Sequence, residues 1–121
     1  MTGLTRAQPA RIGLVGEPST ELNRALDAAI AHDDLRLALG AAADLPAVDL
    51  RRAARLLFLM SQERSPLYPR AAARWLSRYA AETRELTPAM LAEAADTLAE
   101  LEHGDVDAAE RLLNQLSNSR G

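Results

Sequence analysis

Apolar residues recur every three to four positions along most of the chain, and this spacing is typical of amphipathic helices. The first stripe of this kind predicts a helix over residues 20–31, with capping oxygens supplied by Ser19 and Thr20. A second helix is predicted over residues 34–44, because an aspartate ahead of it is a good N-cap and a proline follows its end. The N-terminal part of the chain is therefore predicted to hold two short helices.

The middle of the chain carries the strongest apolar signal. Asp49 and the apolar run that follows it predict a third helix over residues 50–60. Its last five residues, 56–60, are all apolar, and no single amphipathic face can hold them, so we expect this helix to be the most buried. A fourth helix is predicted over residues 67–82, with Pro69 tolerated in its first turn.

Two further helices are predicted toward the C-terminus. Thr87 followed by a proline is a typical helix start, and it predicts a fifth helix over residues 88–102. Gly104 suits the left-handed backbone that ends a helix, and Asp105 caps the next one. The apolar stripe of this sixth helix consists of Val106, Ala109, Leu112, Leu113 and Leu116.

The fold class predicted from these patterns is all-α, with five to six antiparallel helices forming either an irregular bundle or three stacked helical hairpins. Residues 1–18 contain three of the six glycines and two of the six prolines without helical periodicity, and we expect a flexible arm there. Its apolar stretch is too short for a signal peptide or a membrane span. A single helical domain is predicted over residues 19–117, followed by a frayed tail, residues 118–121.

Two similar segments suggest an internal repeat. The sequences AHDDL at residues 31–35 and EHGDV at residues 102–106 lie 71 residues apart, each at a predicted helix junction. Half of that spacing, about 35 residues, falls near a third junction, so the chain divides into three helical hairpins. In this respect it resembles tetratricopeptide-like repeats, which implies a concave partner-binding surface. That family's signature tryptophan, glycine and tyrosine do not recur here, and Trp75 stands alone.

Composition indicates the source and the cellular compartment of the protein. All 14 basic residues are arginine, 25 residues are alanine and none is cysteine. The chain thereby resembles short alanine- and arginine-rich helical proteins of actinobacteria, which implies a bacterial source and no particular activity. The lack of cysteine excludes disulfides and thiolate chemistry and favours a reducing compartment, so we expect a cytoplasmic protein without contact to a membrane.

Charge is distributed very unevenly along the chain. Residues 51–84 carry eight arginines against two glutamates, and residues 85–110 carry eight acidic residues and no basic residue. The small net charge of −3 therefore hides a strongly polar molecule. The basic face of one copy could meet the acidic face of another, so a homodimer is one hypothesis for the assembly of this chain.

Arg70, Arg74 and Arg78 form one stripe of the fourth helix, because residues four apart lie on the same side of a helix. The adjoining face carries Tyr68, Ala72, Trp75, Leu76 and Tyr79. The first interpretation places the aromatic rings in the core and the arginines in solvent, partly paired with the acidic fifth helix. The second is a nucleic-acid surface, with phosphates on the arginines and bases stacked on Trp75 or Tyr79. The third is a protein-binding surface.

Groups capable of catalysis are scarce. His32 and His103 lie beside aspartates, but both are at predicted helix ends, where aspartates act as caps and histidines suit the helix dipole. The glycines around residues 13–16 lack the lysine that a phosphate-binding loop requires. We therefore expect no catalytic residues, no metal site and no cofactor.

The sequence thus favours a non-enzymatic protein-interaction module with an unknown protein partner. The residues predicted to bind that partner are Arg70, Arg74, Trp75 and Arg78. The alternative is a nucleic-acid-binding regulator that uses the basic face of the third and fourth helices, including Arg51, Arg52 and Arg55.

Overall fold

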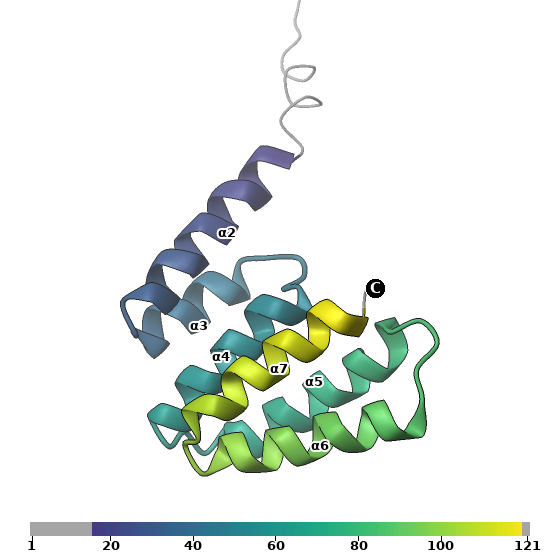
Figure 1. Ribbon diagram of the computed structural model, residues 1–121. Coiled ribbons are helices and arrows are strands. Elements are labelled where there is room, and N and C mark those ends of the chain that lie inside the picture. The colour runs from purple at the N-terminus through teal and green to yellow at the C-terminus, as the bar shows by residue number, and fades with distance from the viewer. Residues whose placement is uncertain (1–15, 120–121) are drawn as a thin grey trace, which may run out of the picture. The chain divides into compact units, whose positions relative to one another are not determined.

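The computed structural model describes residues 16–119, which are all-helical and contain no strand (Figure 1). The predicted all-α fold class is confirmed. The six helices of the described range are α2 (Gly16–Ala31), α3 (Leu35–Ala43), α4 (Leu50–Gln62), α5 (Tyr68–Glu82), α6 (Pro88–Glu102) and α7 (Val106–Ser119). The predicted N-terminal arm lies outside the described residues up to position 15, as do the last two residues of the predicted tail.

Helix α2 begins at Gly16, earlier than the predicted start at residue 20. Ser19 and Thr20 consequently lie inside the helix and not at its cap. Pro18 falls in the first turn, where the missing N–H would have no partner within the helix anyway, so proline does not oppose a helix there. At the other end of the chain, α7 extends to Ser119.

Side-chain caps open four of the described helices as their sequences predict, and at α7 the Asp105 carboxylate accepts a hydrogen bond from the Asp107 amide at 2.9 Å. The carboxylate of Asp34 accepts a hydrogen bond from the Leu37 amide at 3.0 Å, and that of Asp49 accepts one from the Arg52 amide at 2.8 Å. The Thr87 hydroxyl accepts one from the backbone N–H three residues on, at 3.1 Å. Each cap satisfies an amide that the first turn leaves without a helical partner.

Left-handed residues close three of the described helices. Gly104, after α6, has φ +84° as predicted, but Asp33 and Arg64 occupy the equivalent positions after α2 and α4 with φ of 56° and 53°, whereas Glu85, with φ 54°, lies in the loop between α5 and α6. After α4 the backbone forms a six-residue turn, in which the Ser65 amide donates a hydrogen bond to the Met60 carbonyl at 2.8 Å. A side chain in this conformation costs free energy that glycine avoids.

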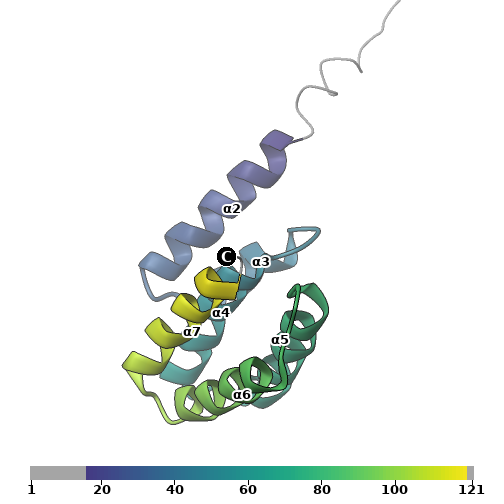
Figure 2. The same cartoon turned by 45° about the vertical axis from the view of Figure 1, so that its right-hand side comes forward.

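The described chain divides into two compact units, with the boundary between Ala47 and Val48. The first unit consists of α2 packed on α3. In the second unit α4 packs on α5 and α7, and α6 packs on the same two helices; Figures 1 and 2 show these four side by side. This ring of contacts fits a helical bundle, one of the two predicted alternatives. Repeat symmetry stays a prediction.

The core of the second unit draws on every helix. The apolar end of α4 is covered as predicted, with Leu56, Leu57, Leu59 and Met60 buried. In α7 the buried face differs from the predicted stripe, because Val106 is 59% exposed and the buried set is Ala108, Leu112, Gln115 and Leu116. A polar Gln115 is accommodated there because its amide is hydrogen bonded within the core.

Aromatic side chains of α5 connect the four helices of this unit. The Trp75 indole donates to the Leu50 carbonyl of α4 at 2.9 Å, and the Tyr68 hydroxyl donates to the Leu98 carbonyl of α6 at 2.7 Å. The Gln115 amide of α7 donates to the Tyr79 hydroxyl at 3.1 Å. The rings of Trp75 and Tyr79 stack with their centroids 5.3 Å apart. Buried polar contacts of this kind fix the register of helices that apolar packing alone would leave free to slide.

The left-handed junctions give a matched pair of predictions. Arg64→Gly removes a left-handed side chain and should raise the free energy of unfolding by roughly 0.5–1 kcal/mol. Gly104→Ala introduces one and should lower it by about 1 kcal/mol. Urea unfolding followed through Trp75 fluorescence measures both changes. A less stable Arg64→Gly protein would contradict the structural account of this junction.

Burial raises the pKa of Tyr68, and the negative charge of Glu102 adds to the increase. The folded chain therefore keeps this proton at a pH where the unfolded chain, with a tyrosine pKa of about 10, releases it. The stability that the hydroxyl contributes is fully present below pH 10 and is lost as the pH rises above it.

Tyr68→Phe should accordingly cost about 1 kcal/mol of unfolding free energy at neutral pH, the value of one buried hydrogen bond. The difference from the wild type should shrink as the pH is raised from about 9 to about 11, since only the wild type carries the Tyr68 titration. Urea unfolding at a series of pH values measures this difference. A difference that stays constant over that range would show that the hydroxyl is not held protonated by its burial.

Candidate functional site

Helix α5 separates its side chains into two faces as the first interpretation of the sequence expects. Tyr68, Ala72, Trp75 and Tyr79 are all buried. Trp75 is 3% exposed, with its ring stacked and its N–H bonded inside the molecule. A side chain in that position is unavailable to a partner, so Trp75 leaves the predicted binding set and belongs to the core. Sequence alone could not decide this, because tryptophan is common both in cores and at interface hot spots.

The predicted arginine stripe lies on the opposite face. Arg70 and Arg74 are exposed, and within residues 16–119 no carboxylate lies at ion-pair distance from either of them. Arg78 is 36% exposed and pairs with Glu82 one turn along the same helix at 3.0 Å. An exposed pair at this spacing contributes roughly 0.3–0.5 kcal/mol. The predicted pairing of the stripe with the acidic helix α6 is not found among the described ion pairs.

The arginines of α4 point elsewhere. Arg51 donates a hydrogen bond to the Ser117 hydroxyl of α7 at 2.6 Å. Arg52 pairs with Asp49 at 2.6 Å, and Arg55 is exposed. Arg51 therefore faces α7, while the stripe lies on α5. No recorded contact joins these two groups of arginines into the single basic face that the nucleic-acid alternative requires.

The pKa of the Asp49 carboxyl group is lowered by its contacts with Arg52. Partial burial raises its pKa, but the amide, the guanidinium hydrogen bond and the charge of Arg52 together outweigh burial and hold the pKa below its ordinary value. The contribution of these contacts to stability is present above the unfolded pKa of 3.8 and is lost as the pH falls below it. This perturbed carboxylate is thus explained by a helix cap and an ion pair.

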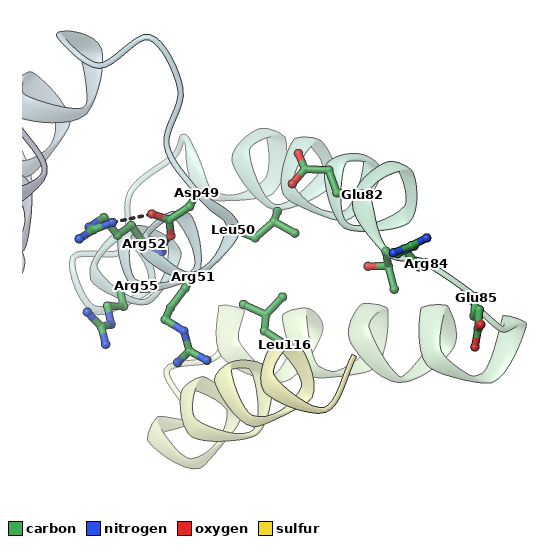
Figure 3. Close-up of a pocket in the computed structure, with 10 residues that line it drawn as sticks. Asp49, Leu50, Arg51, Arg52, Arg55, Glu82, Arg84, Glu85 and Leu116 are labelled. Atoms are coloured by element: carbon green, nitrogen blue, oxygen red, sulfur yellow. Dashed lines mark hydrogen bonds and ion pairs between the residues drawn. The ribbon is translucent and has the colours of Figure 1, made fainter. Parts of the chain in front are cut away.

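A groove opens at this end of the bundle, with a volume of about 980 Å³. Figure 3 shows Leu50 and Leu116 in its middle, between the arginines of α4 on one side and Glu82, Arg84 and Glu85 on the other. Its ten lining residues are Asp49, Leu50, Arg51, Arg52, Arg55, Glu82, Thr83, Arg84, Glu85 and Leu116. The groove was missed in the sequence because its walls come from three separate segments, residues 49–55, residues 82–85 and Leu116, which only the folded chain brings together.

The acidic part of the chain is only partly neutralised. Glu93 and Asp96 on α6 are exposed without a recorded ion pair. Arg111 of α7 pairs with Glu100 and lies 3.4 Å from Asp105, and the hydrogen bond with Glu100 raises the pKa of Arg111. A basic and an acidic surface therefore coexist on the second unit.

Both histidines lie at helix ends as predicted, and both are exposed. His103 lines a second concavity of about 810 Å³ together with Glu102, Arg64 and residues of the α4–α5 junction. Tyr68 also lines it, but the Tyr68 hydroxyl is engaged with the Leu98 carbonyl. Across the described part of the chain, no three histidine, cysteine or acidic side chains are grouped closely enough to hold a metal ion.

No family model, no curated protein and no solved structure matches this chain. Every helix between residues 16 and 119 is too short or too polar to cross a membrane. The two arginine groups, the groove and the acidic surface are therefore the features of this chain that bear on its function.

The assignment of Trp75 to the core predicts a contrast within α5. Trp75→Ala should lower the free energy of unfolding by about 3–5 kcal/mol, the usual effect of removing a large buried ring. Arg74→Ala should change it by less than about 0.5 kcal/mol, since Arg74 is exposed and has no recorded partner. Urea unfolding followed by circular dichroism measures both. A small effect of Trp75→Ala would indicate that the ring lies at the surface, where it could contact a partner.

Proposed function

We propose that this chain is a non-enzymatic, cytoplasmic protein-interaction module that binds an acidic partner surface through the arginine stripe of α5. The proposal rests on one observation: Arg70 and Arg74 are exposed and have no recorded carboxylate partner. The opposite face of the same helix is held in the core by three hydrogen-bonded aromatic residues. The stripe is thus presented on a rigid helix, which lowers the entropy lost on binding.

Burial of the aromatic rings favours a protein partner over nucleic acid. Single-stranded nucleic acid is held largely by stacking of bases on exposed rings, and Trp75 and Tyr79 are 3% and 0% exposed. Phosphate contacts alone would have to supply the affinity, and Arg78 is already paired with Glu82. A protein surface with carboxylates can instead pair with the guanidinium groups through two parallel hydrogen bonds.

Perturbed groups in the structure support a role without catalysis. Three groups have shifted pKa values, and each shift has a structural cause. Asp49 caps a helix and pairs with Arg52, Tyr68 is buried in the core, and Arg111 forms a surface ion pair. Perturbed groups that a structural role explains give no indication of acid–base chemistry. The lack of cysteine supports the cytoplasmic part of the proposal.

The test separates a protein partner from nucleic acid. A photo-crosslinking amino acid at Ala73, which is exposed between two stripe arginines, is used in an extract of the source cells. The stripe variant is Arg70→Ala, Arg74→Ala and Arg78→Ala combined, and the control variant removes the same charge elsewhere through Arg24→Ala, Arg36→Ala and Arg64→Ala. We expect a crosslinked polypeptide, identified by mass spectrometry, that is lost in the stripe variant and kept in the control.

The same three proteins are titrated with labelled single- and double-stranded nucleic acid across a salt series. The proposal predicts no saturable binding. Saturable binding that weakens steeply with salt and disappears only in the stripe variant would establish the nucleic-acid alternative instead. If the crosslinked polypeptide is the chain itself, the partner is a second copy, and sedimentation should show a mass that falls as salt rises.

A further inference from the structure

The groove at the N-terminal end of α4 carries positive charge that the fold leaves uncompensated. Four arginines and three carboxylates line it. Two of these carboxylates already have partners, because Asp49 pairs with Arg52 and Glu82 pairs with Arg78. The lining then retains three further arginines, at positions 51, 55 and 84, and a single further carboxylate, Glu85. The groove therefore has a surplus of cationic groups in a partly enclosed space.

Arg51 occupies a position that is electrostatically unfavourable for its own helix. It lies in the first turn of α4, where the helix dipole disfavours a positive charge, and that turn contains no acidic residue. Its hydrogen bond goes to the hydroxyl of Ser117, which fixes the guanidinium at the groove without neutralising its charge. An oriented, uncompensated cation at this place has the features of a group prepared for an anionic ligand.

The groove also has an apolar floor. Leu50 is half-buried and Leu116 is buried, and Figure 3 shows both between the two charged walls. A free inorganic anion would use neither this floor nor a volume of about 980 Å³. Nucleic acid fits poorly, because the lining includes no aromatic ring on which a base could stack. The lining suits a segment that combines carboxylates with an aliphatic side chain.

We propose that this groove binds a short acidic peptide segment of the partner protein, with carboxylates on Arg51 and Arg55 and an aliphatic side chain on Leu50 and Leu116. This inference rests on the proposed function, since such a segment belongs to a protein partner. It adds a second contact region, separate from the stripe on α5.

The probe is a labelled, capped peptide of repeating Glu-Glu-Leu, followed by fluorescence anisotropy over a salt series. The groove variant is Arg51→Gln with Arg55→Gln. The stripe variant is Arg70→Gln with Arg74→Gln, and the control is Arg24→Gln with Arg36→Gln, so the three variants lose the same charge. We expect saturable binding that is at least about tenfold weaker in the groove variant and changes less than about twofold in the other two. A Gln-Gln-Leu peptide and a Glu-Glu-Ser peptide should each bind at least about tenfold more weakly than the probe.

Stability provides an independent check on the groove variant. Replacing Arg51 removes an exposed hydrogen bond to Ser117 but also relieves a charge that opposes the helix dipole, so the melting temperature should change little and lost binding would not come from unfolding. Equal losses in all three variants would mean nonspecific charge attraction and would overturn the groove. Loss in the stripe variant alone would overturn the groove while keeping the proposed function.

Two competitors complete the test. Single-stranded oligothymidine at the same charge concentration should not displace the peptide. Displacement by this oligonucleotide would overturn the acidic peptide as the occupant of the groove and would favour the nucleic-acid alternative. Displacement by millimolar inorganic phosphate at constant ionic strength would identify a site for small anions and would likewise overturn the acidic peptide as its occupant.

Discussion

The hydrogen bond from the Trp75 indole to the Leu50 carbonyl joins α5 to the start of α4, and the four-helix unit is arranged around it. Tyr68 and Tyr79 extend the same connection to α6 and α7. Apolar packing supplies most of the free energy of folding but little direction, whereas a buried donor must meet its acceptor. The aromatic face of α5 therefore fixes both which helices are neighbours and how they are aligned.

That arrangement determines what the outer surface offers. With the aromatic face of α5 held inside, its arginine stripe points outward from a helix that has little freedom to move. The same indole bond holds the first turn of α4, where Leu50 and Arg51 border the groove. Since exposed ion pairs contribute little to stability, the arginines without partners are not explained by folding, and an interaction with another molecule is the role that their placement supports.

Much of the fold could be predicted from the sequence because local signals decide it. Apolar periodicity located the helices, and Asp34, Asp49, Thr87 and Gly104 marked their ends through chemistry that involves only neighbouring residues. The start of α2 was misplaced because proline is compatible both with a loop and with a first helical turn. The left-handed Arg64 and Glu85 escaped prediction because their side chains do not favour that conformation, which tertiary packing of the helices around them imposes.

The candidate site was less predictable. The stripe of Arg70, Arg74 and Arg78 follows from helical spacing, but the inward position of Trp75 depends on a carbonyl 25 residues away. The groove depends on Leu50 and Leu116 lining the same floor and on Arg51 turning toward Ser117, an arrangement that forms only when α4 and α7 pack together. Periodicity along one helix carries no information about such pairs, and charge counts along the chain could not separate the arginines of α4 from those of α5.

The most direct measurement is acrylamide quenching of Trp75 fluorescence, since Trp75 is the single tryptophan in the chain. A buried, hydrogen-bonded indole should emit at short wavelength and be quenched far less in the folded protein than in urea, and adding the Glu-Glu-Leu peptide should not change its accessibility. Quenching as efficient in the folded as in the unfolded chain would place the ring in solvent and contradict the aromatic face on which the account depends.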